Sequence, residues 1–104
     1  MIREVEQNGL VFSLDLKMHK ATIIDNKNNN NPIFIPRSIN YKGKEFIIKS
    51  IANCSFKKST STVIKFAPDS EIKKIRYKAF FQSSLERIVI PRQVKVIDEY
   101  AFSE

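Results

Sequence analysis

A recurring set of short apolar groups constrains the fold of this 104-residue chain more than any other feature. Phe56 and Phe80 are 24 positions apart, and Phe80 and Phe102 are 22 positions apart. Three columns repeat with this period: Ile33-Phe34-Ile35, Ile64-Lys65-Phe66 and Ile88-Val89-Ile90; Ile48-x-x-Ile51, Ile72-x-x-Ile75 and Val94-x-x-Ile97; Ser55-Phe56, Ala79-Phe80 and Ala101-Phe102. A period in the low twenties is typical of leucine-rich-repeat solenoids, in which neighbouring repeats bury one shared core.

Each repeat is expected to contain short strands followed by a brief helical turn. Alternating apolar residues predict strands with one buried face. The segments Ala52–Lys58, Tyr77–Gln82 and Asp98–Phe102 are predicted to be helical turns, in which a small residue lets the turn approach the sheet and the following Phe fills the interior. The expected fold is mainly β with short helical turns, a leucine-rich-repeat solenoid of about three repeats over residues 33–104.

The segment before the repeats predicts a cap. Leu10, Phe12 and Leu14 alternate with less apolar residues, and a second apolar strand follows a turn at residues 15–19. Because an open solenoid end would expose the core, residues 9–25 are expected to form an N-terminal β-hairpin that covers it. Residues 1–8 are expected to be a polar lead-in, and the whole of residues 1–104 is expected to be one leucine-rich-repeat domain.

Two polar segments are expected to form surface features, one before the repeats and one within them. The asparagine-rich segment at residues 26–32 is expected to be a surface loop, since Asn favours turns and Pro32 ends regular structure. An insertion at residues 40–47 places Tyr41 and Phe46 on either side of Lys42-Gly43-Lys44-Glu45, which predicts a small projecting hairpin. The sequence stops just after Phe102, so we expect a fragment of a longer repeat protein whose open C-terminal end can self-associate.

Composition excludes several kinds of site. Gly9 and Gly43 are the only glycines, so no glycine-rich phosphate loop can form, and the lone Cys54 excludes a disulfide framework or a thiolate metal cluster within the chain. Cys54 is expected to pack as a small hydrophobe. His19, the one histidine, lies in a predicted turn without a suitably spaced nucleophile, carboxylate or further ligand. We therefore expect no catalytic, cofactor or metal site and no enzyme.

The net charge of +7 favours an anionic partner without identifying it. Lys49, Lys73 and Lys95 occupy the same position in successive repeats, which predicts a stacked lysine ladder about 4.8 Å apart per strand. The ladder could bind a polyanion, either a glycosaminoglycan or a nucleic acid. Alternatively, it is a solvated strand edge where lysine discourages pairing between sheets.

A second candidate surface is the outer side of the main strands. Phe34, Lys65 and Val89 lie between inward residues, so they are expected to face solvent, with Arg37, Arg87 and Arg92 nearby. Arginine and aromatic residues are enriched in binding hot spots, which favours a protein-binding patch. The alternative is that another repeat, a loop or a dimer partner covers Phe34.

The third repeat resembles a known family. Ile88-Val89-Ile90-Pro91-Arg92-Gln93-Val94-Lys95-Val96-Ile97, followed by Tyr100-Ala101-Phe102, is similar to the BspA-like leucine-rich repeats, and residues 35–44 are similar to their opening repeat. The resemblance implies a non-enzymatic adhesion module of a microbial or protist surface or secreted protein, with a host matrix or cell-surface protein as partner. Residues 1–6 contain acidic residues and no apolar run, so they are not a signal peptide. No stretch approaches the roughly 18 apolar residues of a membrane span.

Overall fold

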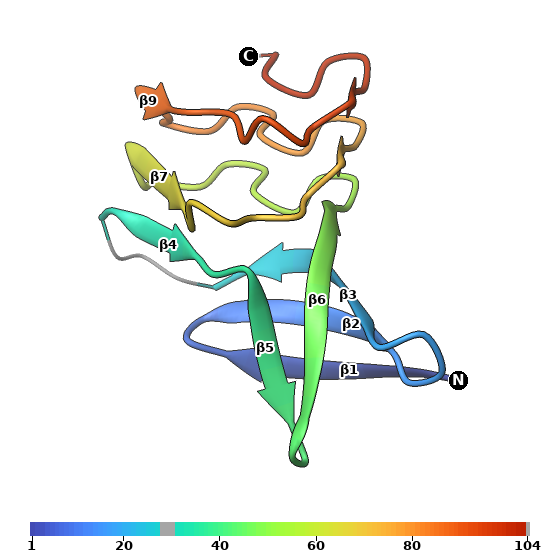
Figure 1. Ribbon diagram of the computed structural model, residues 1–104. Helices are drawn as coiled ribbons and strands as arrows, with labels where there is room; N and C mark the ends of the chain where they lie inside the picture. Colours follow the sequence, from blue (N-terminus) through green and yellow to red (C-terminus); the bar gives the residue numbers. More distant parts are fainter. Residues whose placement is uncertain (28–30, 104) are drawn as a thin grey trace.

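The structure, a computed structural model, describes residues 1–27 and 31–103 and is mainly β. Within these residues it contains two sheets and no helix (Figure 1). The strands are β1 (Ile2–Gln7), β2 (Leu10–Asp15), β3 (Lys20–Asn26), β4 (Ile33–Ile35), β5 (Ser38–Tyr41), β6 (Lys44–Ile51), β7 (Val63–Phe66), β8 (Lys74–Ile75), β9 (Arg87–Ile88) and β10 (Val96–Ile97).

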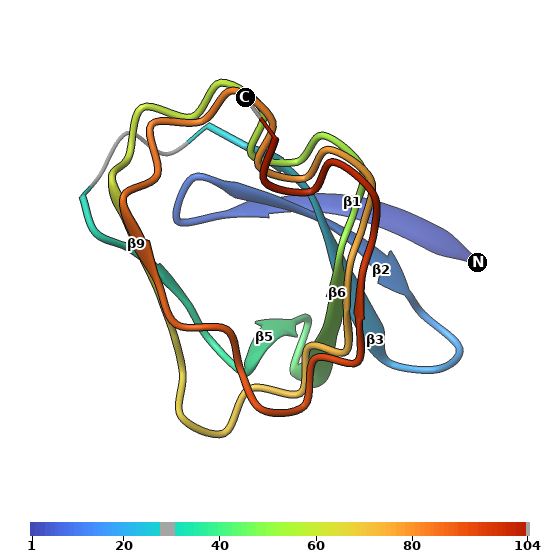
Figure 2. The same cartoon turned by 90° about the horizontal axis from the view of Figure 1, so that it is seen from above.

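The two sheets lie on opposite sides of a stack of coils (Figures 1 and 2). The larger sheet, here sheet A, is mixed: it has the order β1-β2-β3-β6-β8-β10, and β5 pairs with β6. The smaller one, sheet B, has the order β4-β7-β9 and is parallel throughout. Figure 2 shows the successive coils superposed, so the apolar interior continues from coil to coil along the stack.

Strand register confirms the alignment of the repeat columns. Ile33 pairs with Ile64, and Ile64 pairs with Ile88, in sheet B. Ile75 pairs with both Ile51 and Ile97 in sheet A. In the third column the rings of Phe56 and Phe80 are stacked with centroids 5.0 Å apart, and Phe102 continues the stack at 5.0 Å from Phe80. The repeat period therefore corresponds to one coil.

The expected helical turns are absent from the described residues, and consecutive four-residue turns take their place. Cys54, Lys78 and Tyr100 have φ angles of 60°, 53° and 59°, and a residue in this left-handed region cannot continue a right-handed helical turn. The backbone N–H of Phe56 donates instead to the carbonyl of Ala79 at 2.7 Å, in the next coil, and that of Phe80 donates to Ala101 at 2.7 Å. The turns thus hydrogen-bond between coils.

The expected polar lead-in at residues 1–8 was wrong. Residues 2–7 form β1, which pairs antiparallel with the whole of β2. Asn8 and Gly9 both have positive φ, as a two-residue hairpin turn requires. The hairpin expected over residues 9–25 corresponds to β2 and β3, and β1 extends it to a three-stranded meander. β1 is polar because it is an edge strand whose residues are mostly exposed.

The insertion at residues 40–47 forms the expected hairpin. β5 and β6 pair antiparallel, with Ile39 opposite Phe46, and the turn narrows to Lys42 and Gly43, which both have positive φ. The hairpin lies beside the meander (Figure 1). The Ile47 N–H donates to the His19 carbonyl at 3.1 Å, and the buried Phe46 ring meets the His19 ring edge-on at 5.4 Å.

The asparagine-rich loop is described only in part, since residues 28–30 lie outside the described residues. Asn26 belongs to β3 rather than to a loop. The Asn31 side chain donates to Thr62 Oγ1 at 2.8 Å and accepts from the Val63 N–H at 3.1 Å. These bonds attach the start of β4 to the coil that carries β7.

A network of ion pairs joins the hairpin to the second coil. Lys49 Nζ lies 2.6 Å from Glu71 Oε1, and Arg37 Nη2 binds Glu71 Oε2. Arg37 also lies 3.4 Å from Glu45 Oε2, which accepts from the Ser38 hydroxyl at 2.7 Å. The hydrogen bonds from Lys49 and Arg37 lower the pKa of the half-buried Glu71 carboxyl below its ordinary value, and the bond from Lys49 has the larger effect.

Phe80→Ala is expected to lower the free energy of unfolding by about 3–5 kcal/mol, because it removes the central ring of the buried stack and leaves a cavity. Denaturant unfolding measures the change. Phe34→Ala makes the same chemical change at a side chain that is 56% exposed, and its effect should be much smaller. Equal losses in the two variants would contradict a stacked core.

Gln82→Gly is expected to raise the free energy of unfolding by about 0.5–1 kcal/mol, because Gln82 has a φ of 54° that glycine adopts without steric cost. The exposed Gln93, which is not in the left-handed region, provides the matched control. Gln93→Gly should instead destabilise, since glycine there only adds freedom to the unfolded chain. Thermal unfolding of both variants measures the difference, and destabilisation by Gln82→Gly would contradict the strained turn.

Glu71→Gln is expected to destabilise the chain at neutral pH and to have progressively less effect in acid. A carboxyl whose folded pKa is lowered contributes stability above its unfolded value, near 4.5, and that contribution disappears as the pH falls through the folded pKa. Urea unfolding from pH 7 to pH 3 measures the convergence of the two proteins. Glu86→Gln, at an exposed carboxylate with no salt bridge to the described residues, should show no such convergence.

Candidate functional site

The outer face of sheet B presents an exposed row of side chains. Phe34, which is 56% exposed, pairs in register with the exposed Lys65. Val89 is 84% exposed. Ile88 pairs with Ile64, so the next residues along the two strands, Val89 and Lys65, lie side by side. Parallel pairing places Phe34 on β4, Lys65 on β7 and Val89, directly after β9, on one face of sheet B.

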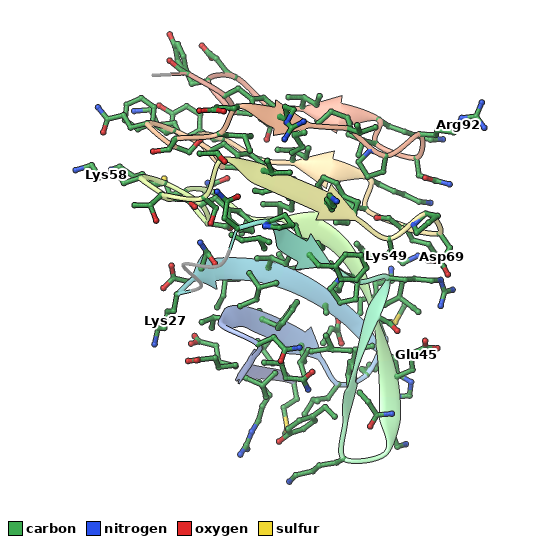
Figure 3. All side chains as sticks on the ribbon, turned by 90° about the vertical axis from the view of Figure 1, so that its left-hand side faces the viewer. Lys27, Glu45, Lys49, Lys58, Asp69 and Arg92 are labelled. Carbon is green, nitrogen blue, oxygen red and sulfur yellow. The ribbon has the colours of Figure 1, made fainter. Side chains whose placement is uncertain are left out.

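A groove of about 460 Å³ lies between β7, β9 and the turns that follow them. We call it the sheet B groove; its lining includes Lys65, Phe66, Pro68, Val89, Pro91 and Arg92. Pro68 and Pro91 follow the two strands closely, where a residue without an N–H ends strand pairing. The groove is therefore mainly apolar with two cations, and Figure 3 shows Arg92 extending outward from its coil.

The other residues predicted for this surface lie outside the sheet B groove. Arg87 pairs with Val63 and borders a separate hollow near Asn31, which Lys65 also lines. Phe34 lines a third hollow with residues of β2 and β5. Arg37 is held by Glu71 and Glu45. The structure therefore brings Lys65, Val89 and Arg92 together in one groove and leaves the other three outside it.

The three ladder lysines are stacked through their backbones. The Lys73 N–H donates to the Lys49 carbonyl at 2.9 Å, and the Lys95 N–H donates to the Lys73 carbonyl at 2.8 Å. Their charges are not equivalent, because Lys49 is half-buried in its salt bridge to Glu71, whereas Lys73 and Lys95 are exposed. Glu71 thereby relieves the repulsion between like charges on neighbouring strands.

A second groove, also of about 460 Å³, lies on the outer face of sheet A. We call it the sheet A groove; its polar lining is Ser13, Asp15, Lys20, Thr22, Lys49, Ser50, Lys73 and Lys74. Sequence reasoning did not single out Lys20, Thr22, Ser50 or Lys74 as site residues. Their signal was available, since each lies next to a buried residue along its strand and so points outward.

The two residues singled out for their chemistry, His19 and Cys54, both lie in turns. His19 has a φ of 56° in the turn after β2, as its predicted turn position allows. Cys54 was expected to pack as a small hydrophobe, but it is exposed: it lies in a turn with a φ of 60°, and the following Ser55 and Phe56 are the residues buried there. Among residues 1–27 and 31–103, no three His, Cys, Asp or Glu side chains gather as metal ligands. The same residues contain no helix of the length and apolarity needed to cross a bilayer.

Comparisons with known proteins agree with this architecture. No curated protein matches the chain significantly. The crystal structure of a leucine-rich repeat protein from Bacteroides capillosus is similar, with a TM-score of 0.57 and 14% sequence identity; the match covers 92% of this chain and 98% of that one. At this identity the likeness concerns the fold alone.

The family comparison is more specific. The model of the "BspA type Leucine rich repeat region (6 copies)" matches residues 37–104. This match includes the β5–β6 hairpin and the coils that carry the aligned columns. The chain therefore belongs to the BspA-type leucine-rich-repeat family.

Proposed function

We propose that the chain is a non-enzymatic protein-binding module of the adhesion type, with the sheet B groove as its binding surface. The observation that carries the proposal is the gathering of Lys65, Val89 and Arg92 in one apolar groove. Membership of a leucine-rich-repeat family supports a role in protein interaction. A host matrix or cell-surface protein is the partner that we propose, and a surface or secreted location follows from that role.

The chemistry of the groove defines the segment that it would bind. Phe66, Pro68 and Pro91 provide apolar walls, and their positions at the ends of β7 and β9 hold them on a hydrogen-bonded scaffold. Lys65 and Arg92 add positive charge. An apolar segment flanked by carboxylates complements such a surface, with the cations contributing to orientation and association rate.

Self-association remains a prediction from the sequence. The last coil exposes Ile97, Tyr100 and Phe102, at 50%, 52% and 40% respectively. The number of repeats, about three, also remains a proposal.

A second candidate function is polyanion binding by sheet A. The backbone stacking of Lys49, Lys73 and Lys95 favours it, and so does the net charge of +7. Because Lys49 is bound to Glu71, this function would depend on Lys73, Lys95 and the neighbouring lysines of the sheet A groove.

A pull-down from matrix and cell-surface extracts, at low and high salt, tests the two functions. We expect a specific protein to remain bound at high salt. After its identification, Val89→Ser and Arg92→Ala should each weaken the purified complex by about 1 kcal/mol or more, about fivefold in affinity, as central contacts do. Lys58→Ala is the matched control for Arg92→Ala, because it removes one positive charge at the opposite edge (Figure 3).

A further variant carries Lys73→Glu and Lys95→Glu, and it keeps Lys49 so that the Glu71 salt bridge survives. Protein binding through sheet B should withstand this change. The sheet B proposal would be contradicted if binding were lost at high salt and in the Lys73→Glu, Lys95→Glu variant, while Val89→Ser and Arg92→Ala bound normally. That result would favour a polyanion as the ligand.

A further inference from the structure

We infer that the sheet A groove binds sulfate groups carried on an anionic polysaccharide; the inference deepens the second candidate function and rests on it. The groove differs from the predicted lysine ladder in composition. It includes Lys20 and Lys74, which do not belong to the ladder, and its lining does not include Lys95.

The groove results from an irregularity in the strand pairing. Ile48 and Ile51 are both buried although they are three positions apart, so Lys49 and Ser50 between them both face outward. The register of β3 against β6 shifts between Ala21 and Thr22, as it must where two residues on one strand bulge outward. The next coil repeats the arrangement with Lys73 and Lys74 between Ile72 and Ile75. Two adjacent outward columns therefore run along the stack.

A row of hydroxyl groups extends the column of Ser50 and Lys74 onto β3 and β2. Ser13 pairs with Thr22, and Thr22 pairs with Ser50. The hydroxyl oxygens of Thr22 and Ser50 lie 3.2 Å apart. Ser50 in turn pairs with Lys74, so the row of neutral donors ends at an ammonium group. Hydroxyl and ammonium donors side by side are suited to the several acceptor oxygens of one sulfate.

Three of the four lysines in the groove are available for a ligand. Lys20, Lys73 and Lys74 are exposed and form no salt bridge with the described residues, whereas Lys49 is held by Glu71. One carboxylate, Asp15, lines the groove.

Asp15 is the last residue of β2 and lies at the β2–β3 side of the groove. Its Oδ1 accepts hydrogen bonds from the backbone N–H groups of Met18 and Lys17, each at 3.0 Å. These hydrogen bonds lower the pKa of the Asp15 carboxyl, and the bond from Met18 has the largest effect. Asp15 and its partner Lys20 lie on β2 and β3, and Ser50, Lys73 and Lys74 lie on or beside β6 and β8. The sulfate site is therefore at the β6–β8 end, away from Asp15. The Glu71 carboxylate near this end is already paired with Lys49 and Arg37.

The lining favours a sulfated saccharide over a nucleic acid. Single-stranded nucleic acids are bound by stacking bases on aromatic side chains, and within the described part of the chain no aromatic residue lines this groove. Lys73 and Lys74 are adjacent on one coil, and the exposed Lys95 follows Lys73 on the next coil, about 4.8 Å along the stack, which suits closely spaced sulfates. The hydroxyl row can also bond to sugar hydroxyl groups.

The experiment measures binding of the 104-residue chain to a short heparin oligosaccharide, its chemically desulfated counterpart, and single-stranded DNA of equal charge. We expect heparin to bind more tightly than DNA, and the desulfated sugar to bind weakly. Lys73→Ala with Lys74→Ala should reduce heparin affinity by about tenfold or more, since two charge-assisted contacts are lost. Thr22→Val with Ser50→Ala should reduce it by about threefold without changing the charge.

The matched control is Lys57→Ala with Lys58→Ala, which removes the same charge from the exposed turn between coils and should change heparin affinity less than about twofold. Circular dichroism establishes that each variant is folded. Equal losses in the two lysine pairs would overturn the site and leave only diffuse charge attraction. Tighter binding of DNA, or equal binding of the desulfated sugar, would overturn the ligand class. No binding of any polyanion would also refute the second candidate function itself.

Discussion

Stacking of one coil on the next is the constraint on which the rest of this structure depends. No coil has enough apolar residues to enclose a core alone, so each buries its interior against its neighbours. Phe80 shows this directly, because its ring lies between the rings of Phe56 and Phe102 while its N–H donates to the following coil. Side-chain packing and backbone hydrogen bonding therefore have the same period, and this coincidence sets the register of both sheets.

The same register organises the surfaces. Once inward residues are aligned, the residues between them must also align, and they form rows across strands that are far apart in the sequence. Phe34 and Lys65 are brought together in this way on sheet B, and Ser50 and Lys74 on sheet A. A repeat protein thus builds extended binding surfaces from positions that contribute little to the core. The two grooves differ because sheet B strands alternate regularly, whereas sheet A strands present two outward residues in succession.

Electrostatic pairing then determines which charged residues remain available. Glu71 binds Lys49 and Arg37 together, and it thereby removes one lysine from the ladder and one arginine from the predicted patch. Arg76 is likewise paired with Asp98 at 3.0 Å. Lys73 and Lys74, which are exposed and form no salt bridge with the described residues, therefore remain available on sheet A.

The sequence by itself determined the mainly β class, the repeat columns and the exposed positions of Phe34, Lys65 and Val89, because each depends on local alternation and on a fixed period. The β1 strand was also recognisable in principle from Asn8-Gly9, a hairpin dipeptide. The left-handed turns at Cys54, Lys78 and Tyr100 were not, since none of these residues is the glycine or asparagine that usually marks such a turn. Tertiary structure alone decided the pairing of Lys49 with Glu71 and the gathering of hydroxyls and lysines on sheet A. Such contacts join residues on different coils, and their partners depend on bulges and side-chain directions that no local pattern encodes.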